Sequence, residues 1–219
     1  MNEHSNAANQ LAAGISALPG TGKSFACTQA LWRFLKNPAV TLPALAEPML
    51  DLARETLADN SAPVVLVVHD WSMLNFAKHS SKSDRFERTH STDVGYELST
   101  SLLVEASEGM PVAVAELSLR TSRKVLTTRK SKERISRAHV DQVGPAMDAS
   151  ETWELDRCLV HIVDREADSV AHYRQWNQAG HDFVVRADAN RRVRWRGESI
   201  KLPDVVATLH KGDAFQTKK

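Results

Sequence analysis

The sequence predicts an α/β protein in which helices pack on a mixed sheet, with a small helical region ahead of the sheet. Two observations support this fold class. Three apolar runs, at 64–68, 100–106 and 111–117, follow one another, and two further runs, at 158–164 and 182–188, each follow a helical stretch. Successive strands form an antiparallel meander, whereas strands separated by helices pair in parallel, so this order yields a mixed sheet.

The composition of the chain is ordinary for a globular protein. Its 219 residues can form one sizeable core with a small helical subdomain, and 42% of them are hydrophobic. The formal net charge of +1 gives no global argument for a nucleic-acid partner, so such an argument rests on local clusters. Two cysteines, Cys27 and Cys158, indicate a reducing compartment, and no apolar run is long enough to cross a bilayer, so we expect a cytoplasmic protein.

Residues 1–60 are expected to be helical. Ser24 can cap a helix that runs to Lys36, where an Asn-Pro pair stops it. Thr41 opens a second stretch with the apolar periodicity of a helix. Pro48 is placed in the first turn of this second helix, or before its start, because proline lacks the N–H that a helix interior needs.

The central strands are expected to be buried. The run Val64–Val68 is continuous and β-branched, which is typical of a strand buried on both faces, and we expect this strand to end at Asp70. The runs at 100–106 and 111–117 are separated only by the turn at 107–110. This short spacing predicts an antiparallel hairpin.

The rest of the core, which we place within residues 61–190, alternates helices with strands. The elements after the hairpin are a basic connection, a helix, a strand, a helix closed by Gly180 and a last core strand, at 120–137, 140–153, 158–164, 167–178 and 182–188 respectively. Residues 191–219 are rich in arginine and include an alternating segment, which predicts either a lone strand with an unpaired edge or a solvated basic tail.

Two of the predicted strands end in aspartate. Asp70 follows the first core strand, and Asp164 ends the strand at 158–164. If the two strands are neighbours, their terminal carboxylates lie together, and such oxygen ligands are what Mg²⁺ prefers. The alternative role for a strand-end aspartate is to cap the turn that follows it.

Five segments of the sequence resemble one protein family. They are DREAD at 164–168, FVVR at 183–186, WRFLKNPAV at 32–40, VVHD at 67–70 and SLLVEA at 101–106. This set is similar to the cut-and-paste DDE transposases of bacterial insertion sequences, in the branch that contains the transposon five transposase. DREAD together with FVVR is the most specific part of the resemblance.

The resemblance implies a ribonuclease H-like core that cleaves and joins DNA with two divalent metal ions, Mg²⁺ or Mn²⁺. It implies that Asp70 and Asp164 are catalytic metal ligands. It also implies that Arg165 and Arg186 contact DNA or substrate phosphate, for which the planar guanidinium group is suited. The alternative for both arginines is a surface ion pair with a nearby acid. Intact members of the family act as dimers on the double-stranded DNA of transposon ends.

The chain departs from the family pattern at two points. Trp71 and Ser72 stand where the family has two hydroxyl residues after its first aspartate. The third acid of the family belongs to a Tyr-(2)-Arg-(3)-Glu-(6)-Lys signature, and the segment around Glu198 does not resemble it. Two carboxylates alone hold metal in poor geometry, so we expect the chain as given to be inactive or nearly so. It resembles a truncated transposase in which residues 191–219 begin an inserted β-region.

The segment ALPGTGKS at 17–24 allows a different interpretation. As a Walker A loop, with VVLVVHD at 64–70 as Walker B, it would make the protein a P-loop ATPase. The residues before it are too small for a central strand, so we favour Lys23 and Ser24 as DNA-binding residues at a helix amino terminus, together with Arg33. A non-catalytic DNA-binding protein that inhibits an intact transposase is a further alternative.

Other charged and aromatic residues have less specific interpretations. The eight basic residues within 120–137 are opposed in that segment only by Glu133, so this run either neutralises several DNA phosphates or forms a solvated connector. The histidines show no metal-ligand spacing, and His69 and His161 are expected to pack in the core. Trp32 is expected to pack against a helix or the sheet.

Overall fold

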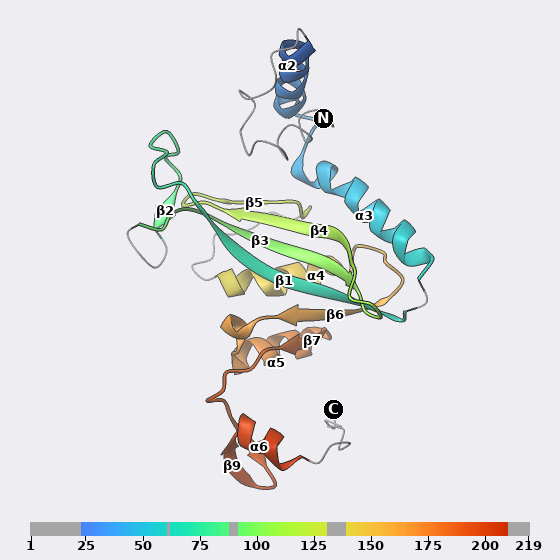
Figure 1. Ribbon diagram of the computed structural model, residues 1–219, viewed down its shortest axis with the longest axis vertical. Coiled ribbons are helices and arrows are strands. Elements are labelled where there is room, and N and C mark those ends of the chain that lie inside the picture. The colour runs from blue at the N-terminus through green and yellow to red at the C-terminus, as the bar shows by residue number, and fades with distance from the viewer. Residues whose placement is uncertain (1–22, 61, 88–91, 131–138, 210–219) are drawn as a thin grey trace.

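The computed structural model describes residues 23–60, 62–87, 92–130 and 139–209, without the side chains of 23–25, 27, 28 and 139. Its centre is a seven-stranded sheet with the order β5-β4-β3-β1-β6-β7, and β2 pairs with β3 beside this path (Figure 1). The strands are β1 Val64–Asn75, β2 Phe86–Glu87, β3 Val94–Glu105, β4 Pro111–Arg120, β5 Val125–Thr127, β6 Cys158–Val163 and β7 Asp182–Val185.

Both strand directions occur in the sheet. The neighbours β1, β3, β4 and β5 pair antiparallel, whereas β6 is parallel to β1 and β7 is parallel to β6. The predicted α/β class, the mixed sheet and the antiparallel hairpin are confirmed. This strand order is compatible with a ribonuclease H-like fold.

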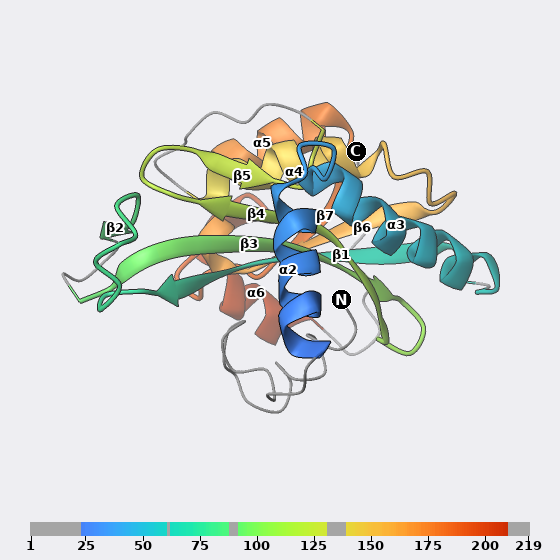
Figure 2. The ribbon, with the colours of Figure 1, turned by 90° about the horizontal axis from the view of Figure 1, so that it is seen from above.

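Three helices cover one side of the sheet. The helical elements are α2 Lys23–Lys36, α3 Leu42–Ala58, η2 His139–Gln142, α4 Val143–Ser150, η3 Arg165–Ala167, α5 Val170–Ala179 and α6 Leu202–Thr208. We call the side covered by α3, α4 and α5 the helical face, and the opposite side the open face (Figure 2). No helix in the described part of the chain is long and apolar enough to cross a membrane.

Two hydrophobic clusters fill the helical face. In the first, Leu50, Ala53 and Leu57 of α3 pack against buried residues of β1, β3 and β4. Their spacing puts them on one side of the helix. In the second, Met147 of α4 and Trp176 of α5 pack with Val163 of β6 and with residues of β7. Burying one large apolar side chain contributes about 1.5–3 kcal/mol, so these contacts attach the helices to the sheet.

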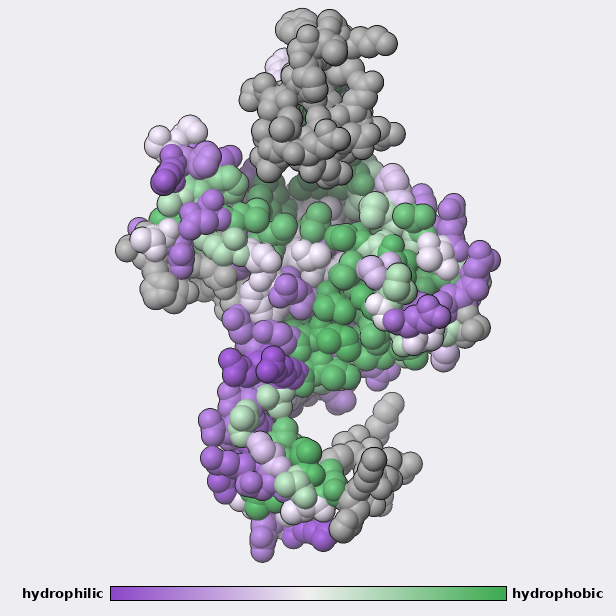
Figure 3. All heavy atoms as spheres, in the orientation of Figure 1, coloured by the Kyte–Doolittle hydropathy of each residue, from purple (hydrophilic) through white to green (hydrophobic). Residues whose placement is uncertain are grey.

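The open face carries the alternate residues of the same strands. Along β1, Val65 and Val67 are buried, whereas Leu66 and Val68 are only partly buried. The prediction that this strand is buried on both faces is therefore wrong, because α3, α4 and α5 all lie on one side. Figure 3 shows the apolar surface that results across the middle of the sheet. By strand register, the apolar side chains of this face include Leu66, Val68, Leu102, Val114, Leu117, Val160, Ile162 and Val184.

Strand β1 continues past Asp70, so the predicted strand end at this residue is wrong. The parallel partner β6 ends at Val163, but the antiparallel partner β3 pairs with β1 as far as Asn75 opposite Gly95. A Cβ atom at Gly95 would lie 1.9 Å from the carbonyl oxygen of Leu74, so glycine is the residue that allows this close approach. Continued pairing with β3, which local sequence does not reveal, extends the strand.

The second helix begins as expected but contains an unexpected proline. Thr41 caps α3, and its hydroxyl accepts a hydrogen bond of 3.3 Å from the Ala44 N–H. Pro43 occupies the first turn, and Pro48 lies inside the helix, so the predicted place of Pro48 is wrong. A proline removes one backbone hydrogen bond, but burial of the apolar side of α3 on the sheet supplies most of the stability of this helix.

The arginine-rich segment after β7 is a folded hairpin. Strands β8 Arg192–Trp195 and β9 Glu198–Lys201 pair antiparallel, and the turn residue Gly197 has a φ of 90°, which glycine adopts without strain. The predictions of a lone strand and of a solvated tail are wrong for this part. Arg191 anchors the hairpin to the core, because its Nη2 lies 2.5 Å from Oδ1 of Asp168.

Candidate metal and nucleic-acid site

Three parallel strands place two carboxylates and one arginine in a row. The last register pairs of these strands join His69 to Val163 and Val163 to Val185. The next residues along β1, β6 and β7 are Asp70, Asp164 and Arg186, and all three are exposed. We call these three residues the edge row.

The edge row belongs to the open face. His69 and Val163 point to the helical face and are buried, so the residues that follow them point the other way. On β3, Thr100 pairs with Asp70 and continues the row on the other side of β1. Pairing of β1 with β6 therefore brings the backbones of Asp70 and Asp164 to adjacent positions, which is the arrangement that a shared cation requires.

Asp164 also caps the turn that follows β6. Its Oδ1 accepts a hydrogen bond of 2.8 Å from the N–H of Glu166, the second residue of η3. This is the alternative role that the sequence allows for a strand-end aspartate. A carboxylate has about four acceptor positions on its two oxygens, so the cap leaves capacity for a cation.

Trp71 connects the edge row to the core. Its indole Nε1 donates a hydrogen bond of 2.9 Å to Oε2 of Glu166, and its ring packs against the second hydrophobic cluster. This contact joins β1 to η3, which begins at Arg165 and is capped by Asp164. Ser72 is exposed and, being two residues from Asp70 on the same strand, points to the same face.

The two predicted phosphate-binding arginines are available at the surface. Arg165 follows Asp164 directly, and the backbone N–H of Arg186 donates to the carbonyl oxygen of Val163 at 3.1 Å. Within the residues that the structure describes, neither guanidinium forms an ion pair, and Asp168 pairs with Arg191 instead. Both arginines thus lie near the carboxylates with their charge available to a ligand.

The residues predicted to bind DNA from the first helix are not brought to the edge row. Helix α2 stands apart from the sheet in Figure 1. Arg33 is exposed on it, and the side chains of Lys23 and Ser24 lie outside the described residues, as does the loop at 17–22. Trp32 is 58% exposed, so the prediction that it packs against a helix or the sheet is wrong.

The basic connection is partly buried and paired with acids. Arg129 is 7% exposed, and its Nη1 lies 2.6 Å from Oε1 of Glu116. Arg120 lies 3.4 Å from the buried carboxylate of Glu97. The prediction that only Glu133 opposes this run is therefore incomplete, because the opposing acids lie on β3 and β4. Neither of these two arginines is free to neutralise a DNA phosphate.

The two strand histidines are buried, as predicted, and bonded to each other. His69 Nε2 lies 2.8 Å from His161 Nδ1, and His69 Nδ1 lies 3.0 Å from Ser101 Oγ. Burial, and then the neighbouring His161, lower the pKa of His69 to about 3. Burial, and then His181, lower the pKa of His161 to about 4. Both imidazoles are therefore neutral at pH 7.

Sequence reasoning missed the grouping of histidines around β6. Ligand atoms of Glu151, His161 and His181 all lie within 4.8 Å of one another. No spacing of residues in the sequence predicts this group of ligands. Its members are distant in sequence, and the packing of α4 on the sheet brings them together. The one local signal is the position of His181, between the end of α5 and the start of β7.

Comparisons with known proteins show no family for this chain. No protein-family model matches, and no curated protein matches. Among solved structures, the Drosophila P element transposase strand transfer complex is similar at a TM-score of 0.33 and 10% sequence identity. That match covers 93% of this chain and 45% of the other chain, so the present chain spans less than half of it. A likeness of this strength carries no argument about function.

Proposed function

We propose that this protein is a transposase-type DNA-binding protein that holds divalent cations between Asp70 and Asp164. The edge row carries the proposal, because two carboxylates and an arginine occupy equivalent positions directly after the last parallel pairs of β1, β6 and β7. Ligand sites of α/β sheets form at such strand ends. The resemblance of DREAD and FVVR to DDE transposases points to the same residues from the sequence.

The side chains of the edge row fit a hard cation on nucleic acid. Carboxylate oxygens suit Mg²⁺ or Mn²⁺, and both aspartates are exposed to solvent. When bound, such cations activate water or a DNA 3′-hydroxyl and stabilise the leaving oxygen of a phosphodiester. Arg165 and Arg186 hold the DNA backbone beside the carboxylates through guanidinium–phosphate hydrogen bonds.

Cleavage is not expected of this chain by itself. The sequence contains no counterpart of the third acid in the family signature. The carboxylate of Glu166, two residues after Asp164, is engaged by the Trp71 indole. With two acids the site supplies few protein ligands, so the proposal concerns binding of cation and DNA, with little or no cleavage.

Cation binding is tested with Mn²⁺, whose free concentration is measured by electron paramagnetic resonance. We expect Asp70→Asn and Asp164→Asn each to weaken Mn²⁺ binding by about tenfold or more, because each removes one charged ligand. Asn at position 164 can still cap η3, so this change separates the charge from the cap. Asp204→Asn, at an exposed position on α6, is the matched control. Equal Mn²⁺ affinity in all four proteins would contradict the proposal.

DNA binding is tested by fluorescence anisotropy over a series of salt concentrations. We expect Arg165→Ala and Arg186→Ala each to weaken binding and to lower the slope of log affinity against log salt by about one, as the loss of one phosphate contact does. Arg157→Ala, a partly buried arginine bonded to backbone carbonyls of Leu57 and Asn60, is the control. Unchanged slopes for both test variants would place the DNA elsewhere.

The two alternatives give different results with the same preparation. Micromolar binding of ATP with Mg²⁺ would support the P-loop interpretation of residues 17–24. A non-catalytic inhibitor would bind element-end DNA in preference to a random duplex at matched salt, and Asp70→Asn would leave that preference unchanged.

A further inference from the structure

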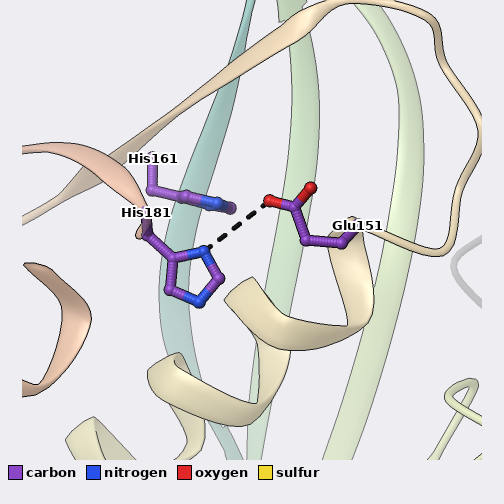
Figure 4. Close-up of side chains that lie close together, drawn as sticks. All are labelled: Glu151, His161 and His181. Atoms are coloured by element: carbon purple, nitrogen blue, oxygen red, sulfur yellow. Dashed lines mark ion pairs between the residues drawn. The ribbon is translucent and has the colours of Figure 1, made fainter. Parts of the chain in front are cut away.

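A second group of potential metal ligands lies on the helical face of the same sheet. Glu151 follows α4, His161 lies in the middle of β6, and His181 precedes β7. Figure 4 shows the carboxylate of Glu151 facing both imidazole rings. Oε1 of Glu151 lies 3.7 Å from Nδ1 of His181, and the ligand atoms of all three residues lie within 4.8 Å of one another.

Hydrogen bonding leaves the correct nitrogen of His181 available to a metal. Its Nε2 lies 2.8 Å from Oδ1 of Asp148, and a carboxylate can only accept, so Nε2 carries the proton. In the neutral form of the ring, which is the form that binds a metal, the lone pair is on Nδ1, the atom that faces Glu151. A carboxylate that orients the far nitrogen of a histidine is the usual outer partner of a metal-binding histidine.

A second chain of hydrogen bonds orients His161. Ser150 donates its hydroxyl proton to the carbonyl oxygen of Met147 at 2.5 Å, so it donates none to His161 Nε2, from which it lies 3.4 Å. When His69 donates from Nδ1 to Ser101, its Nε2 accepts the Nδ1 proton of His161. His161 Nε2 then keeps its lone pair, so the buried network provides a neutral nitrogen ligand.

We propose that Glu151, His161 and His181 form a binding site for a zinc-type divalent metal ion. Two imidazole nitrogens and one carboxylate oxygen suit Zn²⁺, whereas Mg²⁺ and Ca²⁺ prefer oxygen ligands alone. Zinc bonds of about 2.0–2.2 Å in tetrahedral geometry need ligand atoms about 3.3 Å apart. The side chain of Glu151 is 65% exposed, so it can rotate to close the remaining distance.

The exposed side chain of Glu151 gives this site access to solvent. Glu151 and Ser150 line a cavity of about 770 Å³, together with Glu154, Leu155, Arg157 and Cys158. Three protein ligands with one open position is the composition of zinc sites that keep a bound water. The site also joins three separate elements, so a bound metal ties α4, β6 and β7 together and stabilises the fold.

The first experiment is isothermal titration of metal-free protein with Zn²⁺. We expect one equivalent to bind with a dissociation constant below about 10 µM, and saturating Zn²⁺ to raise the Tm by about 5 °C. Glu151→Gln is expected to weaken binding about tenfold or more and to fold normally, because the side chain is exposed. Glu154→Gln, which changes an exposed carboxylate of the same cavity, is the control and is expected to match the wild type.

Cobalt substitution tests the histidine ligands. Co²⁺ is expected to give the strong visible absorption of a tetrahedral site in the wild type, and His181→Asn to lose it. Asp70→Asn is expected to keep Zn²⁺ binding while it loses Mn²⁺ binding, which separates this site from the edge row. No saturable Zn²⁺ binding, or equal binding by Glu151→Gln and Glu154→Gln, would overturn the proposal.

Discussion

Strands β1 and β6, with the residue that follows β6, carry polar side chains on both faces of the sheet. These side chains differ in burial and in hydrogen bonding from one face to the other. On the helical face, His69 and His161 are buried and bonded to each other, and His69 also contacts Ser101. On the open face, Asp70 and Asp164 are exposed, and their backbones occupy adjacent positions after the last parallel pair of β1 and β6. A buried polar group without a partner costs about 1–3 kcal/mol, whereas an exposed one is satisfied by water until a ligand replaces it.

This difference separates buried polar groups from exposed ones. Polar residues of the helical face must be bonded for the protein to fold, so their loss lowers stability. Polar residues of the open face can be changed with little effect on stability, so their loss is expected to appear in binding. Three pairs of measurements test whether the two faces differ in this way.

The largest expected effect is on a buried arginine. Arg129→Met leaves the charge of Glu116 buried without the ion pair of 2.6 Å, so we expect the free energy of unfolding to fall by about 3–5 kcal/mol. Arg186→Met removes an exposed arginine of the edge row and is expected to change stability by less than about 0.5 kcal/mol. Urea denaturation followed by circular dichroism measures both. A similar loss in the two variants would contradict the distinction between the faces.

An intermediate effect is expected for the apolar residues of the two faces. Leu103 is fully buried on the helical face, so Leu103→Ala should lower the free energy of unfolding by about 3 kcal/mol. Leu117 is 39% exposed on the open face, and Leu117→Ala should cost about 1 kcal/mol or less. The same denaturation experiment compares them. If Leu117→Ala costs as much as Leu103→Ala, the open face is covered in solution.

The smallest expected effect is a pH dependence at the margin of the helical face. The hydroxyl of Ser107, followed by the backbone N–H groups of Glu108 and Ser107, lowers the pKa of Glu105 from 4.5 to about 2. The stabilisation from its ionised form is therefore complete above pH 4.5 and is lost as the pH falls towards 2. The stability difference between wild type and Glu105→Gln should shrink over that range. A carboxyl titration of Glu105 by NMR with a midpoint near 4.5 would contradict this prediction.

Much of the fold could be predicted because its signals are local. The hairpin of β3 and β4 follows from two apolar runs with a short turn, and the start of α3 follows from the capping hydroxyl of Thr41. The end of α5 follows from Gly180, which adopts a φ of 88°. Errors arose where a distant partner decided the outcome: β3 extends β1 beyond Asp70, and the sheet holds a helix that contains Pro48.

The candidate site could be predicted in part. Asp70 and Asp164 were singled out by their positions after apolar runs, and the parallel pairing of β1 with β6 puts their backbones next to each other. That they bind a cation remains a prediction. The ion pair of Arg129 with Glu116, and the group of Glu151, His161 and His181, could not be foreseen, because their members lie on separate elements.

Local sequence was enough to place most of the elements and the two aspartates that follow apolar runs, because apolar periodicity, capping residues and turn residues act over a few neighbours. The tertiary structure alone decided which face of the sheet is covered, which charges are buried and which histidines meet. Those outcomes depend on strand register and on helix packing, which bring together residues that are far apart in the chain and leave no pattern in its local order.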